Sequence, residues 1–231
     1  MGLLGNMKMH WHRLRDTRIL NLHGVKVRTG MEDVPKSVRS ALFKGTYEKF
    51  ECDLVKQHVT AGAKVLEIGT GIGLVSLVAT RLSGQGNVLS YEANPKMEAT
   101  IRANYLLNGF EPNLRMKALT ADGRELTFFQ DQNILSSSLH ERDIKSTTIT
   151  VPSVAINDVL KEAAPSVILM DVEGAEVELL EIADLSNVKV MIIEMHPHIV
   201  GHDVIDGLLE SLNAQGFTPA EQQHKTYLFT R

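Results

Sequence analysis

The sequence has little cysteine and no long apolar run, and both absences limit what the protein can be. Cys52 is the only cysteine among 231 residues, so an internal disulfide is excluded and a reducing compartment is expected. No apolar stretch approaches the roughly 20 residues that a membrane-spanning helix needs. The first 18 residues also lack the apolar centre of a signal peptide. We therefore expect a cytoplasmic protein without a membrane segment.

The sequence also lacks an excess of positive charge. Its 24 Lys and Arg residues are outnumbered by 28 Asp and Glu residues, which gives a formal net charge of −4. Beyond residue 30 no basic stripe stands out, whereas domains that bind nucleic acids carry clustered Lys and Arg. A nucleic-acid partner is therefore not expected. The apolar fraction of 43% is large enough for the core of an α/β domain with additions.

Short apolar segments alternate with helical patterns over most of the chain. The expected strands cover residues 65–68, 88–91, 114–119, 167–170, 188–193, 217–220 and 226–230. Strands that alternate with helices form a parallel sheet with helices on both faces. The last two strands resemble a hairpin and add one antiparallel strand. The sequence thus predicts a doubly wound α/β fold with a mostly parallel sheet.

Two segments stand outside this alternating order. Residues 1–45 are expected to form an N-terminal extension, with a short hairpin at 18–28 and a helix at 35–43. This extension either docks loosely or serves as an arm for a partner, and a homodimer is one option that the sequence leaves open. Residues 126–129 and 147–151 predict an antiparallel strand pair inserted into the domain that spans residues 46–231.

The glycine turn after the first buried strand is the most informative segment. Gly69, Gly71 and Gly73 follow a G-x-G-x-G spacing, and glycine lets bare backbone approach a ligand. A dinucleotide fingerprint would need glycine at position 74, which is Leu74. The carboxylate of Glu67 would repel a pyrophosphate but suits a ligand with an amino group or a positive charge. S-adenosylmethionine has both.

Acidic residues stand at four expected strand ends: Glu67, Glu92, Asp171 and Glu194. The carboxyl ends of parallel strands meet at one edge of the sheet, where ligands bind. A carboxylate at a strand end can simply cap the next helix. Four of them converging favour a ligand or cation, because crowded like charges repel each other.

Two of the expected sites concern the nucleoside part of a ligand. Glu92 lies about twenty residues past the glycine turn, where an acidic side chain can accept hydrogen bonds from both ribose hydroxyls. Its neighbour Ala93 borders the ligand or packs in the core. Asp122 could accept from the adenine amino group, although Asp122-Gly123 is also a common turn pair.

The segments after the fourth and fifth strands are expected to hold the reacting group. His196 lies two residues past a buried strand, and its ordinary pKa of about 6.5 suits a general base. Asp171 or Glu194 would orient the acceptor. The series His196, His198 and His202 matches no specific zinc spacing. A hard cation held by Asp171 with Glu194 or His196 is an alternative, but we assign no metal from the sequence.

Four motifs occur in a characteristic order, at residues 67–73 (EIGTGIG), 91–95 (YEANP), 171–176 (DVEGAE) and 193–196 (IEMH). Together they resemble the FkbM family of S-adenosylmethionine-dependent methyltransferases. The serine triplet at residues 136–138 is a further similarity. The resemblance implies a class I methyltransferase fold with seven strands, the last antiparallel. It also implies that Gly69, Thr70, Gly71 and Gly73 form the cofactor turn and that Asp171 borders the methionine part.

The resemblance further implies methyl transfer to a hydroxyl of a sugar, natural product or other small molecule. Amino methyltransferases that act on bases often carry Asn/Asp-Pro-Pro-Tyr/Phe after the fourth strand, where this chain has Asp171-Val172-Glu173-Gly174. The aromatic ring that would stack on a flipped base is absent. Two alternatives remain: a nicotinamide-dependent oxidoreductase, and a non-catalytic protein that keeps the cofactor pocket.

Overall fold

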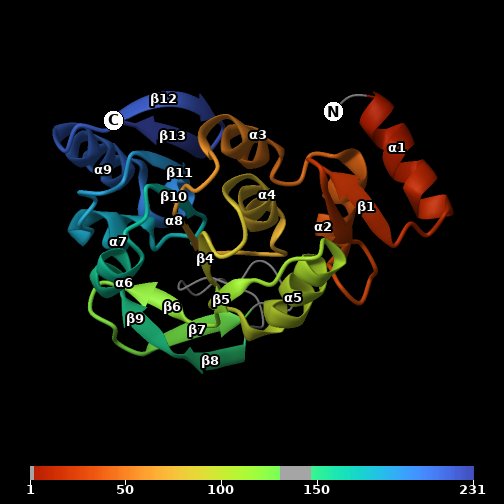
Figure 1. Ribbon diagram of the computed structural model, residues 1–231, viewed down its shortest axis with the longest axis horizontal. Coiled ribbons are helices and arrows are strands. Elements are labelled where there is room, and N and C mark those ends of the chain that lie inside the picture. The colour runs from red at the N-terminus through yellow and green to blue at the C-terminus, as the bar shows by residue number, and fades with distance from the viewer. Residues whose placement is uncertain (1–2, 131–146) are drawn as a thin grey trace.

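A seven-stranded sheet forms the centre of the computed structural model, which describes residues 3–130 and 147–231 (Figure 1). In sheet order the strands are β12 (Thr218–Gln223), β13 (Thr226–Thr230), β11 (Val190–Glu194), β10 (Val167–Met170), β3 (Val65–Ile68), β4 (Val88–Tyr91) and β5 (Asn113–Arg115). Strands β11, β10, β3, β4 and β5 pair in parallel. Strand β13 runs antiparallel to both of its neighbours, which confirms the predicted single antiparallel strand.

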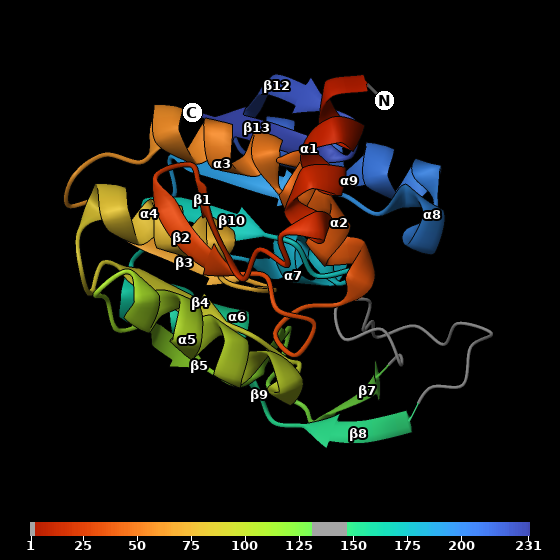
Figure 2. The ribbon, with the colours of Figure 1, turned by 90° about the vertical axis from the view of Figure 1, so that its right-hand side faces the viewer.

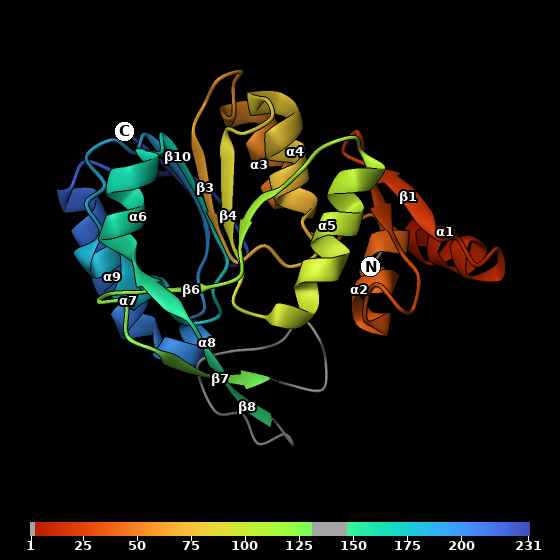
Figure 3. The same cartoon turned by 60° about the horizontal axis from the view of Figure 1, so that its bottom comes forward.

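Helices cover both faces of this sheet, as Figure 3 shows. One face carries α3 (Lys49–His58), α4 (Leu74–Ser83) and α5 (Glu98–Leu107), and the other carries α6 (Ile156–Ala163), α7 (Glu176–Ile182) and α9 (His202–Ala214). Side chains of a strand alternate between the two faces. Accordingly Val167 and Leu169 belong to the first core cluster, whereas Ile168 and Met170 belong to the second. Because both faces are buried, the central strands are mostly apolar, with Glu67 of β3 and Ser90 of β4 as buried polar exceptions.

The N-terminal segment is more ordered than the sequence suggests. It contains α1 (Leu3–Leu14), the hairpin of β1 (Ile19–Leu22) and β2 (Val25–Arg28), and α2 (Lys36–Lys44). Val25 and Val27 are buried in the same cluster as the residues of α4 and α5. Figure 2 shows α1 on the outside of this segment, next to α2. The hairpin prediction is confirmed, and the helix of residues 3–14 was not predicted.

The expected strand at residues 114–119 is wrong, because the chain breaks it in two. Strand β5 ends at Arg115, and β6 (Ala118–Thr120) leaves the main sheet to pair in parallel with β9 (Ser153–Ala155). The backbone N–H of Ala118 donates to the carbonyl of Pro152, 2.9 Å away, which redirects the chain. The sequence does not signal this change of partner, because buried residues occur on both sides of the break, Leu114 before it and Ala118 and Leu119 after it.

The inserted strand pair is confirmed. Strand β7 (Leu126–Gln130) pairs antiparallel with β8 (Thr147–Val151), next to the β6–β9 pair and apart from the main sheet (Figure 1). The serine triplet at 136–138 lies outside the described residues. Two short helical segments, residues 95–97 and α8 (Pro197–Val200), follow strand ends at the same edge. No helix in the described ranges 3–130 and 147–231 has the length and apolar character to span a membrane.

The side chain of Asn104 in α5 connects this helix to the glycine turn and to strand β2. Its replacement tests how much these buried hydrogen bonds stabilise the fold. Its side chain donates to the carbonyl of Ile72 and accepts from the N–H of Arg28, both at 2.8 Å, and it is fully buried. Replacing it in Asn104→Ala leaves two buried backbone groups without partners. We expect a loss of about 2–4 kcal/mol in the free energy of unfolding, measured by urea denaturation.

Asn157 is the matched control for this change. It also bridges two backbone groups, the carbonyl of Ile182 and the N–H of Asp184, but at the surface, where water can replace it. Asn157→Ala should cost less than about 1 kcal/mol. Equal losses in the two variants would contradict the burial argument.

Candidate functional site

A cavity of about 820 Å³ opens at the carboxyl ends of β3, β4, β10 and β11. Its volume falls within the roughly 300–1,000 Å³ of small-molecule sites. The turns that follow these strands line it, together with residues 46–51 before and within α3 and residues 223–226 between β12 and β13. The acidic residues predicted at the strand ends, Glu67, Glu92, Asp171 and Glu194, all border this one cavity.

The glycine turn after β3 packs backbone against backbone. Gly69 has a φ of +86°, and a Cβ there would lie 1.8 Å from the carbonyl oxygen of Asp171. Only glycine fits, because this oxygen belongs to main chain that cannot rotate away. Gly69 also donates its N–H to the carbonyl of Tyr91 at 2.9 Å. The turn thus contacts the ends of both neighbouring strands, β10 and β4.

The other two glycines have different roles. A Cβ on Gly71 would lie 3.3 Å from the hydroxyl of Tyr47 and 3.5 Å from Glu48, so these side chains lie directly over the turn. Gly71 and Thr70 line the cavity. Gly73 has a φ of +81° and starts α4, where it lies against Ile101, and it is not among the lining residues.

Glu92 faces the glycine turn and holds it in place. One of its carboxylate oxygens accepts the backbone N–H groups of Thr70 and Gly71, at 2.9 and 3.0 Å, and the other accepts from Asn94 at 2.7 Å. Burial raises the pKa of Glu92, while these backbone donors lower it, and the net direction is upward. A carboxylate has about four acceptor positions. Three are therefore filled by the protein, and Glu92 still borders the cavity beside Ala93.

Two buried carboxylates face the cavity without a full set of partners. One oxygen of Glu67 and one of Glu48 lack a hydrogen-bond partner among the described residues. Burial raises the pKa of Glu67 to about 7 and raises that of Glu48 well above its ordinary value. Buried acceptors of this kind are costly unless they are satisfied. A ligand with hydrogen-bond donors and positive charge would satisfy both.

Glu48 and Tyr47 were not predicted from the sequence. The pattern of residues 46–59 indicates a continuous helix, whereas α3 begins only at Lys49 and Glu48 has a left-handed φ of +45°. That conformation is uncommon for a residue with a Cβ and is often found at functional sites. Nothing in the sequence signals it, because glutamate is an ordinary helix former.

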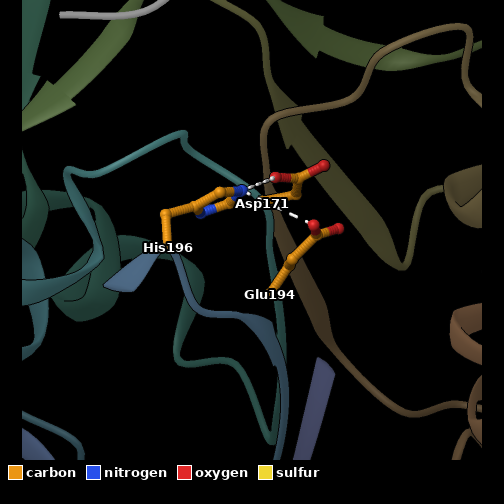
Figure 4. Close-up of side chains that lie close together, drawn as sticks. All are labelled: Asp171, Glu194 and His196. Atoms are coloured by element: carbon orange, nitrogen blue, oxygen red, sulfur yellow. Dashed lines mark ion pairs between the residues drawn. The ribbon is translucent and has the colours of Figure 1, made fainter. Parts of the chain in front are cut away.

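His196 lies at the opposite end of the acidic edge from the glycine turn, among carboxylates (Figure 4). Its Nε2 atom lies 3.6 Å from Asp171, 3.5 Å from Glu194 and 3.9 Å from Glu173. The ring is 1% exposed, while 48% of the Asp171 side chain and 28% of the Glu194 side chain can be reached by solvent. The structure thus brings together the three residues that the sequence predicts as catalytic.

Glu176 contacts the His196 residue on the side away from Asp171 and Glu194, and it fixes the position of this residue. It is fully buried at the start of α7 and accepts the backbone N–H groups of Gly174 and His196, at 2.8 and 2.7 Å. Its carboxylate also lies 3.4 Å from Nδ1 of the His196 ring. From its sequence position alone, Glu176 would be an ordinary acidic residue at a helix N-terminus. The structure shows that it connects the β10 and β11 turns.

The surrounding carboxylates determine the protonation of His196. Burial alone would lower the pKa of its ring, but Glu176, Glu194 and Asp171 more than offset this effect and raise it to about 10. Although half of its side chain reaches solvent in the cavity, the loss of water on its other side and repulsion from Glu194 raise the pKa of Asp171 above its ordinary value. In the protein without ligands His196 is therefore a cation at neutral pH. A base must be neutral, so His196 needs added positive charge nearby before it can accept a proton.

The structure does not bring Asp122 to the cavity. Its side chain is 64% exposed and pairs with Arg124 at 3.0 Å, and Arg124 in turn pairs with Glu178 on α7. Arg124 thus holds Asp122 in a surface turn after β6. Lys117, Ala118 and Leu119 line the cavity near this point instead. The predicted adenine contact of Asp122 has no support from its position.

This arrangement defines a class of protein. An open sheet with its seventh strand antiparallel, a glycine turn after β3 and an acidic residue after β4 are the features of the class I methyltransferase fold that the sequence motifs predict. The sequence model of the methyltransferase FkbM domain matches residues 67–219. The chain belongs to this family. It is therefore an S-adenosylmethionine-dependent methyltransferase, and the expected fold, enzyme class and cofactor are confirmed.

Some solved structures are similar to this chain at low sequence identity. They include a putative rRNA methylase from Clostridium thermocellum, with 10% identity and a TM-score of 0.50 over 78% of this chain and 91% of that chain. A magnesium protoporphyrin IX methyltransferase from Synechocystis PCC 6803 with bound S-adenosylmethionine is 12% identical, with a TM-score of 0.46 over 84% and 82%. These likenesses concern the fold and not the substrate. No curated protein matches the chain.

The raised pKa of Glu67 predicts a pH dependence of stability. Glu67 is 2% exposed, and its pKa is about 7 in the folded protein against 4.5 unfolded, so the folded state holds a proton that the unfolded state has lost. Its contribution to stability is therefore full below pH 4.5 and is lost as the pH rises through 7. The loss amounts to about 3 kcal/mol.

Glu67→Gln should remove this dependence, since the amide mimics the protonated acid. Urea denaturation between pH 4.5 and 8 measures the slope for wild type and variant. Glu181→Gln, which changes an exposed glutamate at the end of α7, should keep the wild-type slope. A wild-type slope retained in Glu67→Gln would show that Glu67 ionises normally.

Proposed function

We propose that this methyltransferase transfers the methyl group to a hydroxyl of a small molecule, such as a sugar or natural product. The observation that carries the proposal is the arrangement of the cavity, with the glycine turn at one end and Asp171 and Glu194 at the other. His196 does not line the cavity itself but lies buried within 3.6 Å of both carboxylates. Such a cluster can accept the hydrogen of a hydroxyl. The DVEG motif supplies no aromatic ring next to Asp171 to stack on a base, which supports a small-molecule acceptor rather than nucleic acid.

The residues around the glycine turn fit the cofactor. Gly69, Gly71 and Glu92 all border the cavity. Glu92 would accept the ribose hydroxyls in place of some of its present backbone donors. The unsatisfied oxygens of Glu67 and Glu48 suit the ammonium group of the methionine part. In our proposal Thr70 and Ala93 complete this part of the site, and Gly73 acts indirectly by starting α4.

The residues at the other end would position the acceptor. The sulfonium of S-adenosylmethionine supplies an already activated methyl group. The protein must align the acceptor oxygen, exclude water and take up one proton, and positioning alone can supply several kcal/mol. Asp171 and Glu194 face the cavity and would orient the hydroxyl. His196 would take its proton once the positive charge of the bound cofactor lowers the pKa of the ring.

We further propose that residues 46–231 form the methyltransferase domain and that residues 1–45 are an extension that closes the cavity. Val38 and Ala41 of α2 line the cavity together with residues 46–51, which supports this role. Selection of the acceptor would then fall partly to the extension. A cytoplasmic location is supported by the single, buried Cys52, whose thiol pKa is raised by burial.

Cofactor binding is tested by thermal unfolding. S-adenosylhomocysteine at about a hundred times its Kd should stabilise the protein by ~2.7 kcal/mol, which raises Tm by roughly 5–10 °C at this size. NAD should leave Tm unchanged. Glu48→Gln should weaken the binding at least about tenfold, because it removes a buried charge that faces the ligand. A shift with NAD alone would favour the oxidoreductase alternative.

The protonation of His196 is tested by NMR titration of its ring. In the protein without ligands the ring should titrate near pH 10, because carboxylates surround it. Glu194→Gln should lower the midpoint by about one unit or more, since it removes one of these charges. Bound S-adenosylmethionine should lower it as well. A midpoint below 7 in the free protein would contradict the electrostatic account of this cluster.

A further inference from the structure

We propose that Asp171, Glu194 and His196 bind a divalent cation, of the Mn²⁺ or Mg²⁺ type, at the acceptor end of the cavity. The three side chains come from the ends of two adjacent strands, β10 and β11, and point toward one another (Figure 4). One ligand atom from each residue lies within 4.8 Å of the others. The proposal deepens the proposed function, on which its catalytic part rests, whereas the binding itself can be measured independently.

The distances suit a coordination sphere. Nε2 of His196 lies 3.6 Å from Oδ1 of Asp171 and 3.5 Å from Oε1 of Glu194. Ligand atoms at about 2.0–2.2 Å from a metal are separated by about 3.0–3.5 Å when they occupy neighbouring positions. The two separations from Nε2 therefore need to shrink by only a few tenths of an ångström, and the two carboxylate oxygens lie within 4.8 Å of each other. Carboxylate oxygens with one imidazole are ligands that Mn²⁺ and related cations accept.

The His196 ring gives independent support, because it is buried without ordinary hydrogen bonds. Its side chain is 1% exposed, and Nδ1 has no hydrogen-bond partner among the described residues. Each contact to a carboxylate is 3.4 Å or longer, beyond the 2.7–3.2 Å of a normal N–H···O bond. The ring is thus aimed at the carboxylates of Asp171 and Glu194 but is not bonded to them. A cation between Nε2 and the two carboxylates would satisfy these three groups, and it would fix the ring so that Nδ1 stays directed at Glu176 on the other side.

Glu176 occupies the position of a supporting carboxylate. It lies behind the ring at 3.4 Å from Nδ1 and is itself fixed by two backbone donors. A histidine that binds a metal through one nitrogen commonly has a carboxylate or carbonyl at the other, which orients the ring. The cluster therefore has both the ligands and the support that a metal site requires.

The local charge also calls for a cation. Three carboxylates, from Asp171, Glu176 and Glu194, lie within 3.6 Å of the His196 ring. Lys225 is 3.5 Å from Glu194, and no other Lys or Arg in the described part of the chain pairs with these three carboxylates. Crowded carboxylates repel one another unless positive charge is brought in. When His196 is neutral and the three carboxylates are ionised, Lys225 leaves two negative charges in the cluster, which a divalent cation would balance.

The cation would change the role of His196 in catalysis. Asp171 and Glu194 line the cavity, so coordination positions not filled by protein would face the acceptor. A cation there lowers the pKa of a hydroxyl that it contacts. With a cation bound there, the hydroxyl proton would leave to solvent, the oxygen would bond to the methyl carbon, and the sulfur would keep the electron pair of the broken C–S bond. His196 then acts as a ligand and not as the base.

Binding is tested with Mn²⁺ itself as the probe. Electron paramagnetic resonance reports the free ion, whose signal falls when protein binds it, and the titration is run with and without S-adenosylhomocysteine. Wild type should bind one Mn²⁺ per chain, and Mg²⁺ should compete. Glu194→Gln and Asp171→Asn should each weaken Mn²⁺ binding at least about tenfold. Glu173→Gln is the matched control, since it removes a charge 3.9 Å from the ring but no ligand, and it should lose less than about threefold.

Two outcomes would overturn the proposal: no Mn²⁺ bound by wild type at about 1 mM, or an equal loss in Glu173→Gln, which would indicate a diffuse negative field. Cooperative thermal unfolding of each variant without ligand shows that the variant is folded, and the shift with S-adenosylhomocysteine is measured on the wild type. It also separates the two proposals, because a shift without Mn²⁺ binding leaves the methyltransferase function intact. Broadening of the His196 ring signals by Mn²⁺ in wild type tests the site without any substitution, and unbroadened signals would overturn it.

Discussion

The close backbone contact between Gly69 and Asp171 is the constraint on which the site depends. No side chain fits at position 69, since a Cβ would lie 1.8 Å from the Asp171 carbonyl oxygen. The contact holds the turn after β3 against the turn after β10. On the β4 side of this contact, Glu92 accepts the N–H of Gly71 and so holds the turn. On the β11 side, Glu176 accepts the N–H of His196 and so holds the turn that carries the histidine. The cofactor end and the acceptor end of the cavity are thus placed relative to each other by main chain, which deforms little.

Charge is the second organising element. The strand ends bring carboxylates into a partly closed cavity, where burial raises the pKa of Glu67, Glu92 and Asp171. An apolar ligand would leave these groups uncompensated. A ligand that brings positive charge relieves repulsion at the same time as it binds. The free protein therefore carries an electrostatic cost, which we expect the cationic cofactor and a divalent cation to reduce.

The sequence predicts the parts of this structure that depend on local pattern. Strand β4 and the glycine turn can be predicted because a few adjacent residues are enough to identify each. The convergence of the acidic residues at one edge can be predicted because the strands that carry them are parallel. Structural features that depend on residues far away in the sequence cannot be predicted from a local pattern. The break after Arg115 reflects pairing of β6 with β9, and the left-handed Glu48 depends on what lies over Gly71. For Asp122 the sequence predicts a site residue that the structure does not bring to the cavity. Its position in the sequence is plausible for a ligand contact, but the sequence cannot show that Arg124 holds the side chain at the surface.

The most direct test of the central claim is a crystal structure of the protein with S-adenosylhomocysteine. The account predicts ribose hydroxyls at Glu92, the amino group between Glu67 and Glu48, and the sulfur directed toward Asp171. A ligand bound elsewhere, or a cavity filled by protein side chains with Glu92 turned outward, would contradict it.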